Sequence, residues 1–381
     1  MRFGKTLATV LLTLSILSAP AISYGVEGTA QQLFGVEALP QMTKLRIAYM
    51  PPSVHGLVCY MAQEKGWFKD VNLDVELLPF LNGPAMMEAN SSWDVGVAGA
   101  GGLISGIIGY DIVMTGLAVW DNLLDLYVRE DSPIYKAGKG HIAGYPNIYG
   151  RPEDWKGTQW LLPAGTTLHL TILNTLSRIG LTDKDITISS MDATSGNTAF
   201  KAGQGDGVGL WMTLSIMAEQ SGLKKASGIL EGGSRISCNL FATKTALASN
   251  RDASRKFLDL FLQIANWIDN NREDCVQYFI ETCEEDGISI SPEVSRAGLN
   301  STTTPTLAEQ IAFSVNKMPD PRNPSQQITE MEGILIDTFD FFASQGRYSA
   351  ADRAKILGGY VDPSLLLELK AEYEKAGKPI K

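Results

Sequence analysis

An internal duplication of one strand–helix unit restricts the fold of this chain more than any other feature. Residues 46–99 are read as a strand, a turn, a helix and further strands, and residues 158–210 repeat that order. Matching landmarks keep offsets of 112 to 114 residues: Pro51 and Pro163, Gly66 and Gly180, Asp94 and Asp206. The elements expected in the two copies are strands 46–50, 73–78 and 93–97 with a helix at 56–65, and strands 158–162, 186–190 and 206–210 with a helix at 168–179.

Alternating strands and helices of these lengths indicate parallel sheets covered by helices, so two copies predict two α/β lobes of related design. Ligands of open parallel sheets bind beyond the carboxyl ends of the strands, where helix N-termini offer unpaired N–H groups. Two such edges that face each other form a cleft. The loops expected to line it are 51–55, 82–83 and 99–102 in the first lobe and 164–169, 192–197 and 211–213 in the second.

The last third of the chain is predicted to be helical. Residues 251–271 place Phe257, Leu260, Phe261 and other apolar side chains on one stripe with helical spacing. Residues 328–342 and 363–375 repeat this pattern, and these helices are expected to complete the core of the first lobe. Three prolines within residues 318–324 predict a connector between them.

The first 25 residues have the pattern of a signal peptide. Arg2 and Lys5 precede an apolar run at 7–17, and Ala19-Pro20-Ala21 offers small residues for cleavage. An apolar run of this length is well below the roughly 20 residues that cross a bilayer, which disfavours the alternative of a membrane anchor. No cysteine follows the run, so we expect a soluble periplasmic protein that is not a lipoprotein and is a monomer.

Charge and cysteine content exclude other classes of protein. With 32 basic and 42 acidic side chains, the surface does not suit binding of a phosphate backbone, which argues against nucleic acid. Cys275 and Cys283 lie eight residues apart in one expected helix, 272–284, where a rise of about 12 Å allows a disulfide only if the helix breaks. Cys59 and Cys238 are expected as buried apolar side chains, so this is no disulfide scaffold.

No constellation typical of an enzyme is present. The three histidines, His55, His141 and His169, have no metal-ligand spacing, and the glycines at 99–102 form no phosphate-binding fingerprint. We therefore expect no catalytic residue, no metal and no cofactor.

The chain resembles the nitrate, sulfonate and taurine group of ABC-transporter substrate-binding proteins, which also includes binders of thiamine-pyrimidine precursors. The resemblance covers roughly residues 44–271 and depends on several segments in order. These are Ala62-Gln63-Glu64-Lys65-Gly66-Trp67-Phe68, Leu73-Asp74-Val75-Glu76, Trp93-Asp94-Val95-Gly96, Tyr127 to Ile134, Asp154-Trp155-Lys156-Gly157, Gly165-Thr166-Thr167-Leu168-His169 and Ala199 to Asp206.

Membership implies a type II-like periplasmic binding protein whose two hinge-linked lobes close on a small ligand and present it to ABC permease subunits. The implied division is a signal peptide at 1–25, the first part of lobe 1 at 43–128, lobe 2 at 129–239, and the rest of lobe 1 with extra C-terminal helices at 240–381. The resemblance implies two chain crossings, near 128–130 and 239–241. The chain departs from the family in a longer segment at 136–150, and in Trp211, which no proline follows.

The candidate ligand-binding residues lie in the predicted cleft loops: Ser53, His55, Gly101, Trp120, Asp121, Thr166, Thr167, His169 and Trp211. Asp121 ends an expected strand at 112–119, where its carboxylate suits an ammonium group of the ligand; the alternative is an N-cap for a helix starting at Leu123. Trp211 suits an aromatic wall of the pocket, or a place in the core.

The remaining candidates also have structural alternatives. Thr166 and Thr167 suit an oxyanion, or simply cap their helix. His55 and His169 occupy corresponding turns, as ligand contacts or capping residues. Gly101 permits close backbone approach, either to a ligand or between packed elements.

These residues favour a solute-binding protein for a small anionic or zwitterionic organic solute of the sulfonate, taurine or nitrate kind. The alternatives are a binder of a neutral, pyrimidine-like aromatic solute and an enzyme of the same fold that resembles pyrimidine synthases.

Overall fold

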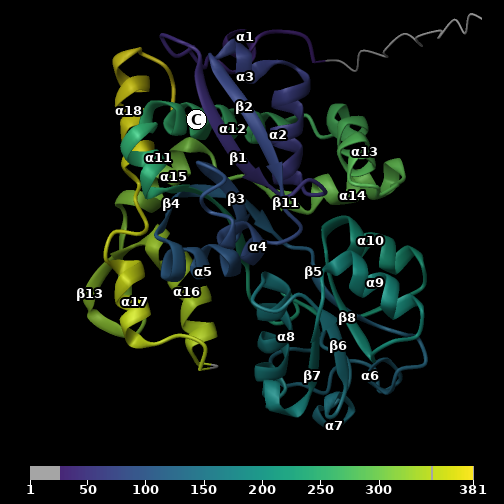
Figure 1. Cartoon of the computed structure of the whole chain (residues 1–381). Helices are drawn as coiled ribbons and strands as arrows, with labels where there is room; N and C mark the ends of the chain where they lie inside the picture. Colours follow the sequence, from purple (N-terminus) through teal and green to yellow (C-terminus); the bar gives the residue numbers. More distant parts are fainter. Residues whose placement is uncertain (1–25, 345, 381) are drawn as a thin grey trace, which may run out of the picture.

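The computed structural model describes residues 26–344 and 346–380. The signal peptide expected at 1–25 lies outside the described residues. The chain forms two α/β lobes, one above the other in Figure 1, with further helices along one side. The predicted two-lobed α/β architecture is therefore confirmed.

The first lobe is built on a six-stranded sheet. The order of its strands is β11 (Thr302–Thr303), β4 (Ile112–Asp121), β10 (Ile236–Thr243), β3 (Val95–Gly99), β1 (Thr43–Tyr49) and β2 (Leu73–Pro79). The first three strands of the chain run parallel, and β10 lies antiparallel between β3 and β4. Its helices are α1 (Ala30–Phe34), α2 (Val54–Glu64), α3 (Trp67–Asp70), α4 (Gly83–Glu88), α5 (Ala100–Tyr110) and α11 (Lys244–Ser249).

The second lobe has a five-stranded sheet of similar design. The strand order is β7 (Thr187–Ser190), β6 (Gln159–Leu162), β8 (Gly207–Trp211), β5 (Leu124–Val128) and β9 (Lys224–Gly228). The helices of this lobe are α6 (Pro133–Lys136), α7 (Pro152–Trp155), α8 (Thr167–Arg178), α9 (Ala193–Lys201) and α10 (Met212–Gln220). Segment 136–150 packs on this lobe, where the N–H of Tyr149 donates to the carbonyl of Ala226 at 2.9 Å.

The predicted duplication is present in hydrogen-bonded detail. The order β2-β1-β3 in the first sheet recurs as β7-β6-β8 in the second. The side chain of Asp94 accepts the backbone N–H of Arg46 at 2.9 Å, and Asp206 accepts that of Gln159 at 2.8 Å. Gly66 and Gly180, which follow corresponding helices, have φ angles of 72° and 76°. The matching aspartates and glycines therefore serve the same backbone purposes in both lobes.

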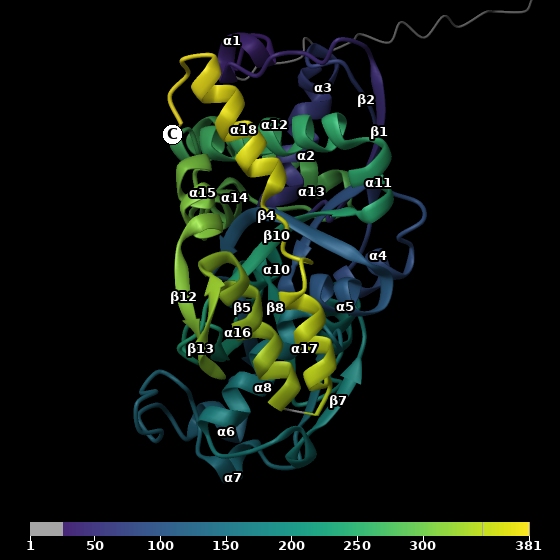
Figure 2. The same ribbon diagram turned by 90° about the vertical axis from the view of Figure 1, so that its left-hand side faces the viewer.

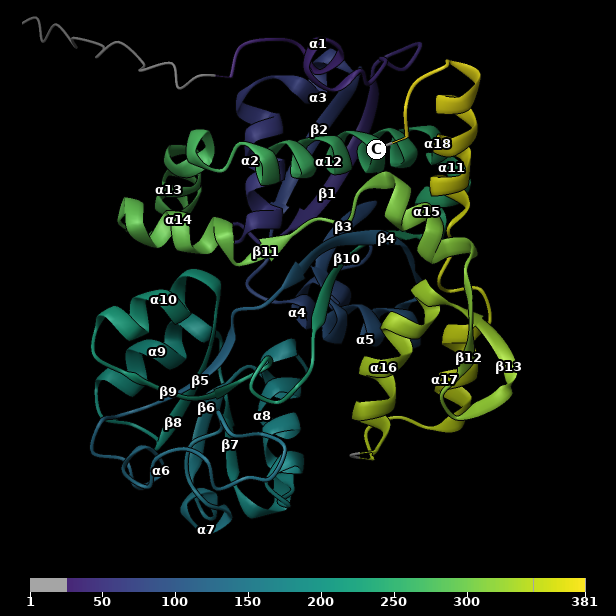
Figure 3. The same ribbon diagram turned by 180° about the vertical axis from the view of Figure 1, so that it is seen from behind.

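The crossings between the lobes occur earlier in the chain than the resemblance implied. The chain leaves the first sheet at Asp121 and enters the second with β5, which begins at Leu124. It leaves the second sheet at Gly228 and re-enters the first at Ile236. The expected positions near Arg129 and Leu240 are thus wrong, because both lie within or beyond strands that are already paired in one lobe. Figure 3 shows the two crossings from behind.

The C-terminal third is helical, as predicted, and it contacts both lobes. Helix α12 (Arg251–Asn270) packs on α2, β1 and β4, and the remaining helices follow it around the molecule. Two of them reach the second lobe: α14 lies against α10 and α16 lies against α8 (Figures 2 and 3). The other helices are α13 (Val276–Glu285), α14 (Pro292–Asn300), α15 (Leu307–Val315), α16 (Glu330–Ser344), α17 (Ala350–Leu357) and α18 (Ser364–Lys375).

Residues 318–324 form most of a β-hairpin, not the connector that was predicted. Strand β12 (Lys317–Asp320) pairs antiparallel with β13 (Asn323–Thr329). Both strands of a two-stranded ribbon are edges, where proline removes no central hydrogen bond. Asp320, at the turn, is fully buried and pairs with Arg353 at 2.6 Å, which ties the hairpin to α17.

All four cysteines are buried free thiols, and burial was predicted for Cys59 and Cys238. The expected helix 272–284 is divided into a 3-10 turn, Glu273–Cys275, and α13. Within the ranges that the structure describes, no helix is both long and apolar enough to cross a membrane.

Candidate ligand-binding cleft

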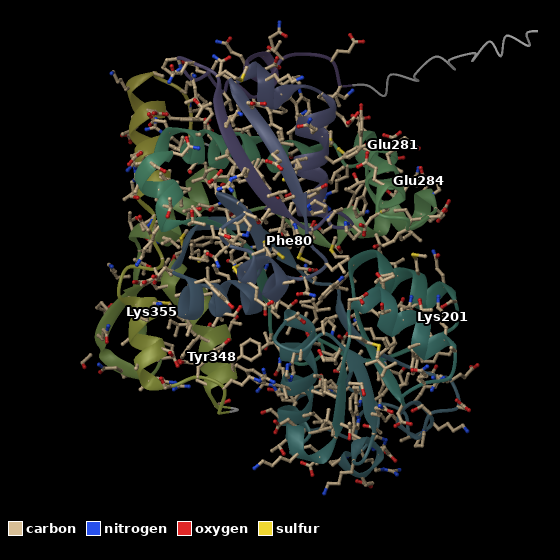
Figure 4. The ribbon with its side chains drawn as sticks, in the orientation of Figure 1. Phe80, Lys201, Glu281, Glu284, Tyr348 and Lys355 are labelled. Atoms are coloured by element: carbon tan, nitrogen blue, oxygen red, sulfur yellow. The ribbon has the colours of Figure 1, made fainter. Side chains whose placement is uncertain are left out.

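A cleft lies between the two lobes, at the carboxyl ends of their parallel strands. Its empty volume is about 860 Å³ including the mouth. Residues from both lobes line it, and Figure 4 shows Phe80 at the centre of the molecule, between the two sheets. The lining residues discussed below are Met50, Ser53, His55, Phe80, Asp121, Thr166, Thr167, Asp192, Trp211, Met212, Cys238 and Asp286.

Six of the nine candidate residues line this cleft: Ser53, His55, Asp121, Thr166, Thr167 and Trp211. They come from loops that are up to 158 residues apart in the chain, from Ser53 to Trp211. Gly101 lies at the edge, where the two lobes touch, and two candidates lie elsewhere.

Trp120 and His169 face away from the cleft. Trp120 precedes Asp121 on β4, and successive side chains of a strand point to opposite sides. Its ring lies 4.7 Å from the guanidinium of Arg235 on the far side of the sheet edge. His169 lies inside α8, where Nδ1 accepts the N–H of Gly165 at 2.9 Å and Nε2 is 3.3 Å from Arg347.

Asp121 ends β4 in the first lobe and is 7% exposed. Its Oδ1 accepts the N–H of Leu123 at 3.0 Å, and Oδ2 has no hydrogen-bond partner among residues 26–344 and 346–380. No helix follows, because residues from Leu124 onward form β5, so the N-cap alternative is wrong. Burial raises the pKa of this carboxyl from 3.8 to about 7. An ammonium group in the cleft would offset that burial.

His55 also contributes an acceptor from the first lobe. Ser53 caps α2: its Oγ accepts the N–H of Gly56 at 2.9 Å and donates to the carbonyl of Met50 at 2.6 Å. The hydroxyl proton is then committed, so the contact of 2.9 Å between Ser53 Oγ and His55 Nδ1 places the imidazole proton on Nδ1. Burial lowers the pKa of His55 to about 4, so Nε2 is an unprotonated acceptor near neutral pH.

The second lobe contributes donors. Thr166 is the N-cap residue of helix α8, but its hydroxyl donates back to the carbonyl of Pro163 at 2.8 Å and leaves the helix without a side-chain cap. Helix α10, whose N-cap is Trp211, also has no side-chain cap among the described residues, but the N–H of its first residue, Met212, donates to the carbonyl of Leu123 at 3.0 Å. The first N–H groups of an uncapped helix are free to bind an anion, and the helix dipole favours negative charge there. Helix α5 of the first lobe, which begins at Gly99, joins them.

The charged side chains that line the cleft are acidic. They are Asp121, Asp192 and Asp286, and none of the lining residues in the described chain is a lysine or arginine. Asp192 is occupied as the cap of α9, where it accepts the N–H of Ser195 at 2.9 Å. The donors that line the cleft are therefore backbone N–H groups and hydroxyls, and Asp121 is a carboxylate that a cationic group in the cleft would meet.

Among the apolar lining residues, Met212 lies in the loop expected at 211–213, whereas the sequence did not identify Phe80 or Cys238. Phe80 follows β2 directly, in the loop for which Asn82 and Gly83 were named. Met212 is buried at the start of α10 and has a φ of 47°, which is unusual for a residue other than glycine. Cys238 lines the cleft from β10 as a thiol whose pKa is raised by burial and by Asp121. No sequence pattern marks Phe80 or Cys238, because their positions depend on the pairing of distant strands.

The structure offers no metal site in the parts of the chain that it describes: no group of three or more histidine, cysteine or acidic side chains lies close enough together to hold a metal ion.

Three solved structures illustrate the fold that this chain shares. The periplasmic aliphatic sulphonate binding protein SsuA from Escherichia coli is 19% identical, with a TM-score of 0.61 over 82% of this chain and 91% of that one. The alkanesulfonate-binding protein SsuA from Xanthomonas axonopodis pv. citri, bound to MOPS, is 16% identical, with a TM-score of 0.61 over 85% and 99%. The periplasmic sulfonate-binding protein SsuA from Methylobacillus flagellatus KT is 18% identical, with a TM-score of 0.55 over 88% and 97%.

These likenesses show the fold of periplasmic binding proteins. No curated protein sequence matches the chain. The family model described as NMT1/THI5 like matches residues 54–274, from the start of α2 to just beyond α12. The chain belongs to the NMT1/THI5 like family.

Proposed function

We propose that this protein is the extracytoplasmic solute-binding component of an ABC importer and that it captures a small zwitterionic organic acid, such as taurine, in the cleft between its lobes. The observation that carries the proposal is the division of polar groups across the cleft. Uncapped helix N-termini provide donors, whereas Asp121 and His55 provide acceptors.

The acidic end of the solute binds at the start of α8. Thr166 and Thr167 line the cleft at the first turn of this helix, and no side chain caps the helix in the described chain. The N-terminus of α5 lies beside that of α8, and its partial positive charge adds to the preference for an anion at this edge of the cleft. A sulfonate or carboxylate satisfies this arrangement.

The amino end binds to Asp121. A buried carboxylate with one free oxygen is destabilised by desolvation, and an ammonium group provides the missing partner. Trp211 and Phe80 supply apolar walls for the short carbon chain between the two charged ends. MOPS, the molecule bound to the Xanthomonas relative, likewise joins a sulfonate to an amine.

The names of the structural relatives support the proposed delivery to a membrane importer. The relatives are named as periplasmic sulfonate-binding proteins, and a signal peptide at 1–25 would place this chain in the same compartment. The signal peptide and the extracytoplasmic location are parts of the proposal. Measurements of secretion and of the intact mass of the secreted protein test them. A mature protein that begins after residue 20 and carries no lipid is expected.

The binding proposal is tested by thermal unfolding with a matched panel of solutes. Taurine carries both ends, ethanesulfonate lacks the amine and ethylamine lacks the acid; nitrate and an aminopyrimidine represent the other solute classes. We expect the largest rise in Tm with taurine, a smaller rise with ethanesulfonate and none with ethylamine. A rise with the aminopyrimidine alone would contradict the proposal and favour the pyrimidine alternative.

A further inference from the structure

The two lobes touch at the start of two helices. The first turn of α5, in lobe 1, lies against the first turn of α8, in lobe 2. The contact is made by Gly99 and Gly101 on one side and by residues 165–167 on the other. The turn of α8 in this contact is the one that carries Thr166 and Thr167 into the ligand cleft.

A side chain at Gly101 would press against the backbone of the other lobe. A Cβ atom added there would lie 3.0 Å from the carbonyl carbon of Thr166, 3.1 Å from the carbonyl oxygen of Gly165 and 3.3 Å from the nitrogen of Thr167. All three atoms are backbone atoms, which cannot turn aside as a side chain can. At Gly99 an added Cβ would lie 2.7 Å from the Cγ2 methyl of Thr167.

Neither glycine is required by its own lobe's backbone. Gly99 has a φ of −63°, and Gly101 has no positive φ, so alanine fits both conformations. Glycine within a helix lowers its stability relative to alanine. The neighbouring Gly102 and Gly106 are different, because they pack against Gly83 and Met87 within lobe 1. Only contact with the other lobe explains Gly101.

We infer that Gly99 and Gly101 form a seat for the first turn of α8 and so determine how far the lobes close on the ligand. The inference rests on the proposed function, because it concerns the same cleft. With the seat empty of side chains, the donors of α8 reach the acidic end of a ligand that also contacts Asp121. A single methyl group on the seat holds the lobes apart. The N–H donors of α8 and the carboxylate of Asp121 are then too far apart to contact the same ligand.

Closure is measured as a distance between lobes by pulsed electron resonance on two spin labels. Lys201→Cys in α9 and Glu284→Cys in α13 place exposed labels on different lobes, on the same side of the molecule (Figure 4). The four natural cysteines are at most 5% exposed, so labelling is selective. Taurine is the probe, and each variant is measured with and without it.

The variants are Gly101→Ala and, as a matched control, Gly109→Ala at the other end of α5, where an added Cβ meets nothing within 4 Å. We expect Gly109→Ala to close as the wild type does. Gly101→Ala is expected to remain folded with an unchanged or higher Tm. It should lose the short distance and bind taurine about tenfold more weakly, as expected for overpacking.

A second pair of variants repairs the contact. Gly99→Ala should also oppose closure, because its methyl meets the Cγ2 of Thr167. Thr167→Ser removes that methyl and keeps the hydroxyl, so the double variant Gly99→Ala/Thr167→Ser should close again. If the double variant remains as open as Gly99→Ala, the contact at Gly99 does not limit closure and that part of the inference is wrong.

The outcomes separate this inference from the proposed function. If taurine neither binds nor closes the wild type, the zwitterion proposal fails. The inference about the seat is then tested by the distance distributions of Gly101→Ala and Gly109→Ala without ligand. A smaller population with the short distance between spin labels in Gly101→Ala than in Gly109→Ala supports the inference that the seat limits closure. Identical distributions in these two variants, with and without taurine, overturn it.

Discussion

The corresponding turns of the two lobes, at Ser53 and at Thr166, share a backbone plan and differ in their polar chemistry. Each hydroxyl donates to the carbonyl three residues earlier, at Met50 and at Pro163. Ser53 in addition caps its helix, whereas Thr166 leaves α8 uncapped. The two turns therefore have a common backbone plan, but the turn of the first lobe caps its helix and the turn of the second lobe does not.

The two histidines of these turns make the same point. Both lie near the start of a helix, yet His55 lines the cleft and His169 lies toward Arg347 and Phe342 of the C-terminal segment. In the second lobe the C-terminal segment covers the side of α8 on which His169 lies. Equivalent positions in sequence therefore need not have equivalent roles.

The largest effect is expected from removing the acceptor of lobe 1. Asp121→Asn keeps the shape of the side chain and removes its charge, so the ammonium of taurine is buried without a partner. Taurine binding should weaken by about 2–4 kcal/mol, whereas ethanesulfonate binding should hardly change. Calorimetry with both ligands checks this. Equal losses of binding free energy for the two ligands would mean that Asp121 does not bind the amine.

Removing the corresponding aspartates, Asp94 and Asp206, should lower the free energy of unfolding by different amounts in the two lobes. Asp94→Ala removes the hydrogen bond from the N–H of Arg46 and the ion pair with the Arg46 guanidinium at 2.8 Å. It should lower the free energy of unfolding by about 2 kcal/mol. Asp206→Ala loses the N–H of Gln159, with an expected loss of about 1 kcal/mol. Urea unfolding measures both; a larger loss for Asp206→Ala would contradict the comparison.

The pH dependence of binding should follow Asp121. Its raised pKa, about 7, means that the ligand-free protein loses stability as pH rises from about 4 to about 7, since the buried carboxyl must ionise. Taurine needs the ionised form, so its affinity should rise about tenfold between pH 6 and pH 8. His55 stays neutral in this range, because burial lowers its pKa to about 4.

Titrations of taurine into Asp121→Asn provide the control for this pH dependence. The variant has no carboxyl at this position, so its affinity should be independent of pH over the same range. A pH dependence that persists in Asp121→Asn would assign the titration to another group.

The smallest effect concerns the two glycines that follow α2 and α8. Gly66 and Gly180 have nearly equal positive φ angles, and a Cβ added to either meets nothing within 4 Å. Alanine at each should therefore cost only the backbone strain, about 1 kcal/mol, and the two losses should agree. Losses that differ clearly in thermal unfolding would show that the turns are not equivalent.

The order of strands and helices in the two lobes was predictable from the sequence, because it depends on local patterns. Strand and helix order, Gly66 and Gly180 depend on residues close together in the chain, and so do the loops that supply Ser53 and Thr166. The cleft was predictable in part, since strand ends of parallel sheets meet at one edge.

The rest depends on distant packing. Trp120 faces the other side of β4 because of strand alternation, which a shift of one residue reverses. Cys238 enters the cleft because β10 returns antiparallel between β3 and β4. His169 is covered by helices that follow it by more than 160 residues. No local pattern contains that information.

A crystal structure of the wild-type protein with taurine tests the central claim most directly, namely that opposite lobes bind opposite ends of one solute. The account predicts the sulfonate within hydrogen-bond distance of the first N–H groups of α8 and of Thr167, with the ammonium at Asp121 Oδ2. Taurine bound in the reverse orientation, or held by one lobe alone, would contradict it.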